Sequence, residues 1–406
     1  MAGKTGVTFK DSKEVPIHRW YPYVEGFSAV WIQEMLKEYC QKEMSVYDPF
    51  GGSGTMNIEA SKMKMKSFFS EMNPFMRFIL NTKTNIVRIM QKNKEPYLVE
   101  MSAVKSHIKS QEFAEENVQD FVEDKYNILL EKEYFQEDDL KKLKMIYDMA
   151  EAGIYSAEVS DLIKCAAACI TVDTSNMTRR ADLRRRRPNE YSTRVVDVER
   201  QFLVKWEQFI DDIECANTLY ESVTCVSFDA REKNIDYKEM FDFVITSPPY
   251  INGTNYIRNT TLELLLSGKA ESEDDLKRLK EKTVCGGISD ASAVRLNDMM
   301  KFPFVEDVAK KLDISSRDKR IPLMIRCYFS DMYKVLNSVY YMMKAGAKFA
   351  LDIGDSKFYG VYVPTDEILC TLAEMVGFRV VSREKIAERF SRDKTMLKQV
   401  LIIFEK

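Results

Sequence analysis

Residues 241–250 read Phe-Asp-Phe-Val-Ile-Thr-Ser-Pro-Pro-Tyr, and this stretch decides the fold of the 406-residue chain. Its first five residues form an apolar run that is typical of a buried strand. The strand must end at the two prolines, because proline has no N–H to donate to a neighbouring strand. In open α/β sheets, ligands bind at the carboxyl ends of the strands. The stretch therefore predicts a binding site at that edge of a sheet.

Three groups in this stretch are suited to binding a nucleobase. A planar base can stack on the ring of Tyr250, and its exocyclic amino group can donate hydrogen bonds to the Ser247 hydroxyl and the Pro248 carbonyl. The alternative is that Pro-Pro-Tyr only ends a strand, and this alternative is favoured for the motif taken alone. A second motif changes that balance.

The second motif is a glycine-rich turn at residues 48–55, which read Asp-Pro-Phe-Gly-Gly-Ser-Gly-Thr. Residues 45–47 predict a short strand before it, and residues 55–60 predict a helix after it. Glycines in such a turn let the backbone approach a ligand, and a helix N-terminus favours polar or anionic groups. The pattern is neither GxGxxG nor GxxxxGK[ST], so a dinucleotide or nucleoside-triphosphate site is not indicated.

Together the two motifs resemble those of the S-adenosylmethionine-dependent amino-methyltransferases of DNA. The Ser-Pro-Pro-Tyr form is most similar to the cytosine-N4 branch, whereas adenine-N6 enzymes more often have Asp or Asn where Ser247 stands. In this chain the glycine-rich motif comes first, while Ser-Pro-Pro-Tyr comes first in most cytosine-N4 enzymes. This order weakens the assignment of cytosine over adenine. The prediction is therefore methylation of cytosine N4, with adenine N6 as the open alternative. The resemblance covers roughly residues 15–95 and 220–406, apart from a segment near residue 300.

The resemblance implies a class I methyltransferase fold. We expect an α/β, Rossmann-like and mostly parallel sheet with a C-terminal antiparallel hairpin and a large helical insertion. Residues 1–95 would form an N-terminal arm and the cofactor-binding half, and residues 96–220 a helical insertion for DNA binding and target recognition. Residues 221–406 would form the catalytic half, with a smaller insertion at about 270–325.

The implied activity is methyl transfer from S-adenosylmethionine to the N4 amine of cytosine in double-stranded DNA. The target base would be flipped out of the duplex, and no metal is required. Such an enzyme would serve restriction-modification or defence, with a cognate restriction endonuclease or defence-complex subunits as partners. Three alternatives remain: an adenine-N6 enzyme, an RNA methyltransferase, and a non-catalytic DNA-binding subunit of a modification complex.

Acidic residues at two further strand ends are candidates for cofactor binding. Glu71 is the last residue of a predicted strand at 66–71 and can accept both ribose hydroxyls. Asp229 follows a strand at 223–227 and can accept from the amino group of adenine. The predicted cofactor-binding residues are Phe27, Ser28, Asp48, Pro49, Phe50, Gly51, Gly52, Ser53, Gly54, Thr55, Glu71, Asp229, Ala230 and Thr246. The predicted catalytic residues are Ser247, Pro248, Pro249 and Tyr250.

Residues 92–220 have the apolar spacing of helices, and residues 131–150 predict one continuous helix. An arginine-rich tract follows at 176–188, where like charges repel unless an anion joins them. It is interpreted either as a solvated loop or as a phosphate-binding segment. The predicted DNA-binding residues are Arg179, Arg180, Arg184, Arg185, Arg186, Arg187, Asn255, Tyr256 and Arg258.

Composition limits the other possibilities. The chain is 45% hydrophobic and 30% charged, and it has no apolar run of about 18 residues that would predict a membrane span. Its start lacks the apolar region of a secretion signal, so a prokaryotic cytosol is expected. The 8 cysteines are scattered without a CxxC pair, and the 2 histidines argue against a His-based metal site. The net charge of −3 means that any DNA binding must rest on local charge.

Overall fold

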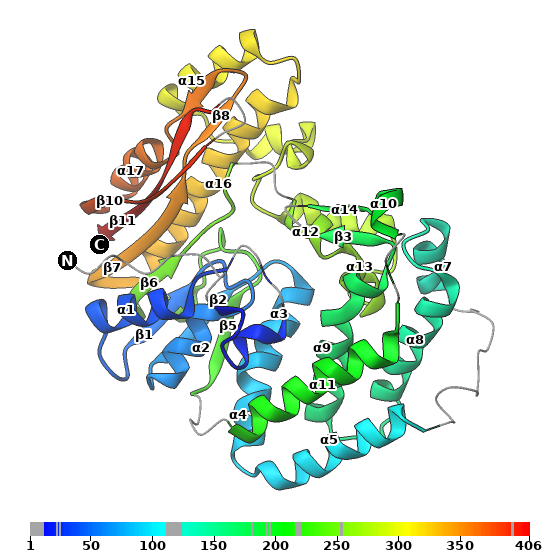
Figure 1. Ribbon diagram of the computed structural model, residues 1–406. Helices are drawn as coiled ribbons and strands as arrows, with labels where there is room; N and C mark the ends of the chain where they lie inside the picture. Colours follow the sequence, from blue (N-terminus) through cyan, green and yellow to red (C-terminus); the bar gives the residue numbers. More distant parts are fainter. Residues whose placement is uncertain are drawn as a thin grey trace.

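The computed structural model describes residues 12–21, 23, 26–110, 124–179, 182–191, 194, 196–215, 221–251, 255–390 and 394–406. Its centre is a seven-stranded sheet with the order β10-β11-β7-β6-β1-β2-β5 (Figure 1). The five strands β7, β6, β1, β2 and β5 are parallel to one another, and β11 is antiparallel to both β7 and β10. This is the strand order of class I methyltransferases, so the predicted fold is confirmed. The strands are β1 (Ser45–Asp48), β2 (Lys66–Ser70), β5 (Val223–Ser227), β6 (Phe241–Thr246), β7 (Met343–Gly354), β10 (Arg379–Phe390) and β11 (Met396–Glu405).

Helices cover both faces of the sheet because successive side chains of a strand point to opposite sides. Val46 packs on one face with α1 (Ala29–Tyr39) and α2 (Thr55–Lys62). Its neighbour Tyr47 packs on the other face with α16 and α17. The helices of this second face are α15 (Pro303–Ser315), α16 (Arg320–Met342) and α17 (Thr365–Val376). Buried parallel strands between two helical layers place every strand's carboxyl end at one edge, which is where the two motifs lie.

A second group of helices lies to the right of the sheet in Figure 1. Its apolar core is continuous with that of α3 and α13, so this segment packs directly against the sheet-forming part. The proposed division of the chain at residues 95 and 220 stays a prediction. The remaining helices are α3 (Pro74–Asn81), α4 (Val87–Gln91), α5 (Lys94–Ile108), α7 (Asp124–Glu131), α8 (Glu137–Glu151), α9 (Ala157–Thr174), α10 (Pro188–Tyr191), α11 (Val198–Cys215), α12 (Tyr256–Asn259), α13 (Thr261–Leu266) and α14 (Glu273–Lys282).

The N-terminal arm is fixed to α11 through one buried carboxylate. Asp212 accepts hydrogen bonds from the backbone N–H of Ile17 at 2.8 Å and from Nε1 of Trp20 at 2.8 Å. It also forms an ion pair with Arg19 at 2.5 Å, and the Trp20 ring stacks on Phe209 with centroids 4.2 Å apart. The arm therefore connects the helical segment to the start of the sheet.

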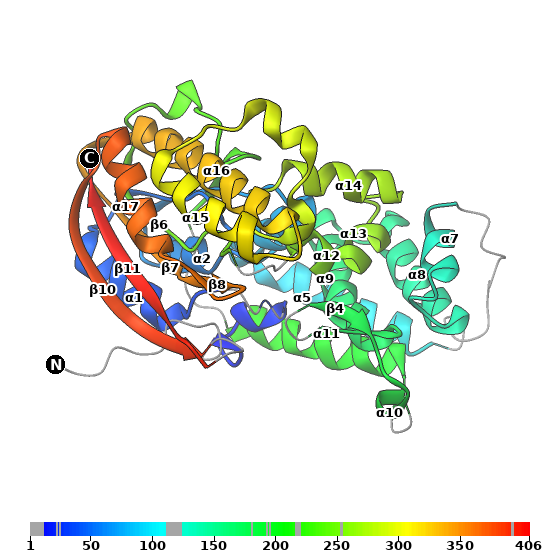
Figure 2. The ribbon, with the colours of Figure 1, turned by 90° about the horizontal axis from the view of Figure 1, so that it is seen from above.

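Two predictions within the helical segment are wrong. The helix predicted over residues 131–150 begins only at Glu137, as α8, because α7 ends at Glu131 and Glu133 turns the chain at a φ of 49°. Asn176 holds that turn by donating to the carbonyls of Glu133 and Tyr134, at 3.1 and 2.7 Å. The arginine-rich tract contains a hairpin of β3 (Met177–Arg179) and β4 (Leu183–Arg185), where no strand was expected. Figure 2 shows α10, directly after this hairpin, projecting from the body of the molecule.

A small hairpin of β8 (Ser356–Phe358) and β9 (Val361–Val363) follows β7 and was also not predicted. In the described ranges, no helix is both long and apolar enough to cross a lipid bilayer.

Candidate active site

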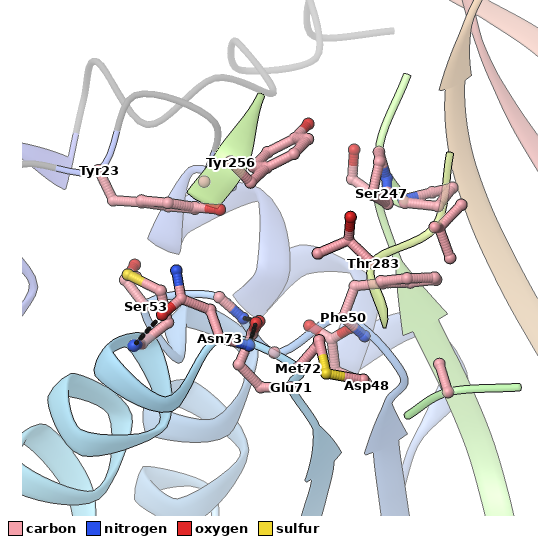
Figure 3. Close-up of a pocket in the computed structure, with 18 of the residues that line it drawn as sticks. Tyr23, Asp48, Phe50, Ser53, Glu71, Met72, Asn73, Ser247, Tyr256 and Thr283 are labelled. Atoms are coloured by element: carbon pink, nitrogen blue, oxygen red, sulfur yellow. Dashed lines mark hydrogen bonds between the residues drawn. The ribbon is translucent and has the colours of Figure 1, made fainter. Parts of the chain in front are cut away.

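A cavity of about 290 Å³ lies at the carboxyl edge of the sheet. Figure 3 shows Ser53 and Asn73 on one side of it and Ser247 and Thr283 on the other, with Glu71 between them. Both sequence motifs contribute to its walls. The predicted residues that line it are Phe27, Asp48, Pro49, Phe50, Gly51, Gly52, Ser53, Thr55, Glu71, Arg179, Asp229, Ala230, Ser247, Pro248, Pro249, Tyr250 and Tyr256.

A buried hydrogen bond joins the two motifs. Thr246, the last residue of β6, donates from its hydroxyl to Asp48 Oδ1 at 2.6 Å. Asp48 is the last residue of β1, and the same oxygen accepts the Phe50 N–H at 2.9 Å. Because β1 and β6 are neighbours in the sheet, this contact aligns the glycine-rich turn with Ser-Pro-Pro-Tyr.

The end of the glycine-rich turn requires glycine. Gly54 has a φ of +83° and begins α2, and a Cβ added there would lie 2.8 Å from Cγ of Leu80. A side chain would therefore be disfavoured both by the backbone conformation and by the packing of α3 against the turn. Gly54 supports the cavity without lining it.

Two of the charged side chains that line the cavity are acids at the glycine-rich turn and at the end of β2. Glu71 accepts the backbone N–H groups of Gly52 and Asn73 at 2.9 and 2.8 Å, and burial raises its pKa. Burial also raises the pKa of Asp48, to about 7. In the part of the chain that the structure describes, neither forms an ion pair, so the cavity is suited to a ligand with positive charge and hydroxyl groups.

A third carboxylate, which the sequence analysis missed, lies beside the Ser-Pro-Pro-Tyr turn. Asp352 of β7 accepts from Nε2 of Gln399 at 2.8 and 2.9 Å. Burial raises the pKa of Asp352 to about 6, although the polar side chains of Gln399, Tyr250 and Ser247 oppose the shift. Ser247 and Tyr250 hydroxyls lie 3.4 Å apart. The available signal was that Asp352 ends an apolar run at residues 347–352 that predicts a strand, as Glu71 ends the run at 66–71.

Asp229, which follows the strand predicted at 223–227, also lines the cavity, but its carboxylate already accepts hydrogen bonds within the protein. Both oxygens of Asp229 accept hydrogen bonds from the Arg231 guanidinium, at distances from 2.6 to 3.1 Å. A contact with an adenine amino group must use the remaining lone pairs of this carboxylate, and it stays a prediction. Ala230 lies next to it in the wall.

Two predicted cofactor-binding residues are buried behind the cavity wall. Ser28 is the N-cap of α1 and accepts from the N–H of Trp31, while Thr246 is occupied by Asp48. Their roles are therefore to fix the wall, whereas Phe27 contributes to its surface.

The predicted DNA-binding arginines have partners within the protein. Arg179 lines the cavity and forms a buried ion pair with Glu263 at 2.5 Å. Arg184 forms an ion pair with Glu190 at 2.8 Å, and Arg258 forms one with Asp182 at 3.1 Å.

The rest of the set lies at several places. Arg185 and Arg186 donate to backbone carbonyls, and the exposed Arg187 follows them. Asn255 is the N-cap of α12 and donates to Ser289 at 2.9 Å. Arg180 lies outside the described residues.

The residues of the cavity fit S-adenosylmethionine. That molecule has a positively charged sulfonium and ammonium group and a ribose with two hydroxyls, and Asp48 and Glu71 offer carboxylate oxygens that form no ion pair with any described residue. Glu71 would hold the ribose, and Gly52 and Phe27 would border the methionine end. Over the described ranges, no cluster of three or more His, Cys, Asp or Glu residues is placed to hold a metal ion.

The chain is similar in sequence to known type II methyltransferases. The chain is 23% identical to type II methyltransferase M.BsoBI of Geobacillus stearothermophilus over 94% of its own length and 82% of that protein. It is also 23% identical to type II methyltransferase M.AvaI of a Nostoc strain, over 92% and 81% of the two chains. No family model matches the chain.

Among solved structures, it is similar to a SAM-dependent methyltransferase of Methanosarcina mazei, with 7% identity, a TM-score of 0.33 and coverage of 92% and 96% of the two chains. The assignment of the fold rests on the strand order of the sheet and not on this likeness. The chain is thus similar over most of its length to type II methyltransferases, and its strand order and acidic cavity accord with S-adenosylmethionine-dependent methyl transfer.

Proposed function

We propose that this protein methylates the exocyclic N4 amine of cytosine in double-stranded DNA, as a modification enzyme of restriction or defence. The observation that carries the proposal is the joint cavity, in which a cofactor-type wall and the Ser-Pro-Pro-Tyr turn face one another. The relatives support DNA as the substrate, since they are type II methyltransferases, the resembled class of DNA-modifying enzymes. A cognate endonuclease is part of the proposal on the same ground.

The proposed reaction uses this chain's groups to orient a weak nucleophile. The lone pair of an exocyclic amine is delocalised into the base, so hydrogen bonds to the Ser247 hydroxyl and the Pro248 carbonyl would favour a tetrahedral nitrogen. When bound, S-adenosylmethionine supplies the electrophilic methyl group. As the nitrogen–methyl bond forms and the sulfur–methyl bond breaks, the amine must lose a proton. Asp352 lines the same cavity as Ser247, and its raised pKa makes it a suitable proton acceptor.

The base would be held by an aromatic ring with a fixed orientation. Tyr250 would stack on it, while its hydroxyl is kept in place by Gln399 at 3.2 Å. Holding the reacting atoms in line and excluding water supplies much of the acceleration in such transfers. Adenine N6 is the second candidate, because its amine presents the same two hydrogens to Ser247 and Pro248.

Cofactor binding is tested at Glu71. Replacing Glu71 with Ala should weaken binding of S-adenosylmethionine about tenfold or more, because hydrogen bonds to a charged group are lost. Glu71→Gln should have an intermediate effect, since an amide oxygen can still accept one bond. Isothermal titration calorimetry measures both, with the exposed Glu374→Ala as the control. An unchanged affinity in Glu71→Ala would remove this residue from the cofactor site.

The identity of the product decides between the two amines. The protein and duplex DNA should give N4-methylcytosine, identified by mass after digestion to nucleosides. Ser247→Ala should lower the single-turnover rate about a hundredfold and change cofactor affinity little, because the hydroxyl matters most as the nitrogen becomes tetrahedral. N6-methyladenine would establish the second candidate, and methylation of RNA alone would refute the proposal.

The carboxylate of Asp352 predicts a pH dependence. It must be ionised to accept a proton, so the single-turnover rate should fall as the pH drops through about 6, the pKa of this group. Asp352→Asn should lower the rate about 10²-fold to 10⁴-fold and abolish that acidic limb. A variant that retained both the rate and the limb would exclude Asp352 from the reaction.

The exposed end of the arginine-rich tract is tested by salt. If Arg187 contacts a phosphate, Arg187→Gln should reduce the slope of log affinity against log salt by about one unit. Arg379→Gln is the control, since Arg379 is 66% exposed on the edge strand β10. Equal slopes for the two variants would favour a solvated role for Arg187. The assay is fluorescence anisotropy with labelled duplex DNA.

A further inference from the structure

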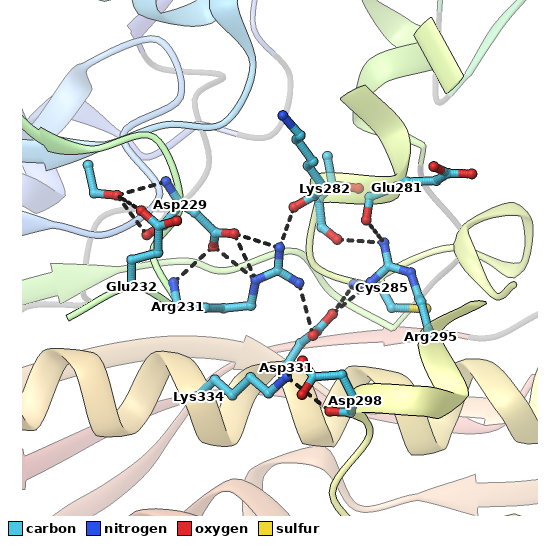
Figure 4. A network of polar contacts seen from close by, with 12 residues as sticks. Asp229, Arg231, Glu232, Glu281, Lys282, Cys285, Arg295, Asp298, Asp331 and Lys334 are labelled. Carbon is cyan, nitrogen blue, oxygen red and sulfur yellow. Dashed lines mark hydrogen bonds and ion pairs between the residues drawn. The ribbon is translucent and has the colours of Figure 1, made fainter. Parts of the chain in front are cut away.

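We propose that Asp331, Arg231 and Arg295 are positioning residues for methyl transfer, because they fix a strap that forms a wall common to the cofactor and the target base. The strap is residues 282–286, which follow α14. The inference rests on the proposed function and adds residues to it that neither sequence motif contains. It begins from a network of ion pairs outside the catalytic groups (Figure 4).

The strap touches both halves of the proposed site. Lys282, Thr283 and Val284 line the cavity alongside the glycine-rich turn and Asp229. At its other end the strap packs on the catalytic turn: a Cβ added to Gly286 would lie 3.2 Å from Cβ of Pro249 and 3.2 Å from the carbonyl oxygen of Tyr250. Displacement of this segment would therefore alter the cofactor wall and the support of Tyr250 together.

One carboxylate on the long helix α16 anchors the strap. Asp331 is 6% exposed and accepts the backbone N–H of Cys285 at 3.1 Å. The same side chain accepts from Arg231 at 3.0 Å and from Arg295 at 2.9 Å. Figure 4 shows the two guanidinium groups approaching Asp331 from different sides. α16 packs on the sheet, so the anchor is a rigid element.

The two arginines then bind the backbone of the strap and of the residues just before it. Arg295 Nη2 donates to the carbonyls of Glu281 and Thr283, both at 2.8 Å, and Arg231 Nη2 donates to that of Lys282 at 2.6 Å. Backbone carbonyls outside a helix or sheet need such donors when they are not solvated. The two guanidinium groups thus donate hydrogen bonds to the backbone carbonyls of this segment, as the N–H groups of a neighbouring strand do in a sheet.

Arg231 also connects the strap to the cofactor end of the site. Its guanidinium bonds Asp229, Asp331 and the Lys282 carbonyl at once, which uses donors on all three nitrogens. The carboxylate partners hold the pKa of Arg231 above its ordinary value in spite of burial, so this side chain stays charged. The relative positions of the Asp229 loop, α16 and the strap are thus set by one planar group, a geometry that lysine cannot reproduce.

The test separates positioning from general stabilisation. Asp331→Asn and Arg295→Gln should each weaken S-adenosylmethionine binding about tenfold, measured by calorimetry without DNA. Each should also lower the single-turnover rate at saturating cofactor and DNA. Gly286→Ala should lower that rate with cofactor affinity nearly unchanged, because its added methyl group presses only on the catalytic turn.

Arg326→Gln is the matched control. Arg326 is on the same helix and pairs with Glu306 at 2.9 Å and Asp313 at 2.7 Å, both on α15 and away from the strap. It should lower the melting temperature like Arg295→Gln while leaving cofactor affinity and single-turnover rate at wild-type values. Rescue of Arg295→Gln by Arg295→Lys should be incomplete, since one ammonium group cannot reach Asp331 and two carbonyls in a fixed geometry.

Several outcomes would overturn the inference. Wild-type affinity and rate in folded Asp331→Asn and Arg295→Gln would do so, and so would equal losses in Arg326→Gln. If those two variants do not fold, Gly286→Ala decides: a wild-type rate refutes the role of the strap. A wild-type protein that binds no S-adenosylmethionine or methylates no DNA would instead refute the proposed function, so the two failures are distinguishable.

Discussion

The hydrogen bond from Thr246 to Asp48 is the contact on which the site depends. It joins residues separated by 198 positions and is buried at the carboxyl ends of two adjacent parallel strands. Because both strands are packed between helical layers, their ends cannot move independently. The glycine-rich turn and the Ser-Pro-Pro-Tyr turn consequently enter the same cavity, although a large helical segment separates them in the chain. This arrangement is supported by groups that do not line the cavity, namely Gly54, Ser28 and the N-terminal arm that Asp212 holds.

Among the described residues, the carboxylates of Asp48, Glu71 and Asp352 line the cavity without an ion pair. Asp48 and Asp352 are buried and Glu71 is half-buried, and desolvation raises the pKa of each. Uncompensated buried acids cost free energy unless a ligand supplies positive charge or hydrogen bonds, which accords with a sulfonium cofactor that carries ribose hydroxyls. The same burial gives Asp352 a pKa nearer to neutrality than an exposed aspartate has. One physical effect thus favours cofactor binding at one end of the cavity and suits proton acceptance at the other.

Other charged groups at and near the cavity do form ion pairs within the protein. Arg231 and Arg295 are paired with Asp229 and Asp331, and Arg179 is paired with Glu263. Guanidinium groups with carboxylate partners hold the segments that they join in a fixed geometry. The arginine-rich tract is thereby divided: part of it supports the hairpin β3–β4, while Arg187 is exposed at the base of the projecting α10. Local charge alone does not distinguish these two uses.

The sequence by itself determined that strands and helices alternate along the parts of the chain that form the sheet. It also determined the two motifs and the acidic residue that follows β2. These features are local: proline ends a strand, glycine permits a left-handed turn, and apolar spacing repeats with the period of the element. Only the tertiary structure decided that Asp352 lies in the same cavity as Ser247, that residues 282–284 border this cavity, and that α8 begins only after the turn at Glu133. Each depends on groups that are distant in the chain, such as the Gln399 amide, the Asp331 carboxylate and the Asn176 side chain. A pattern read along one segment contains no information about which distant partner will satisfy its polar groups, because packing of the whole chain brings those partners together.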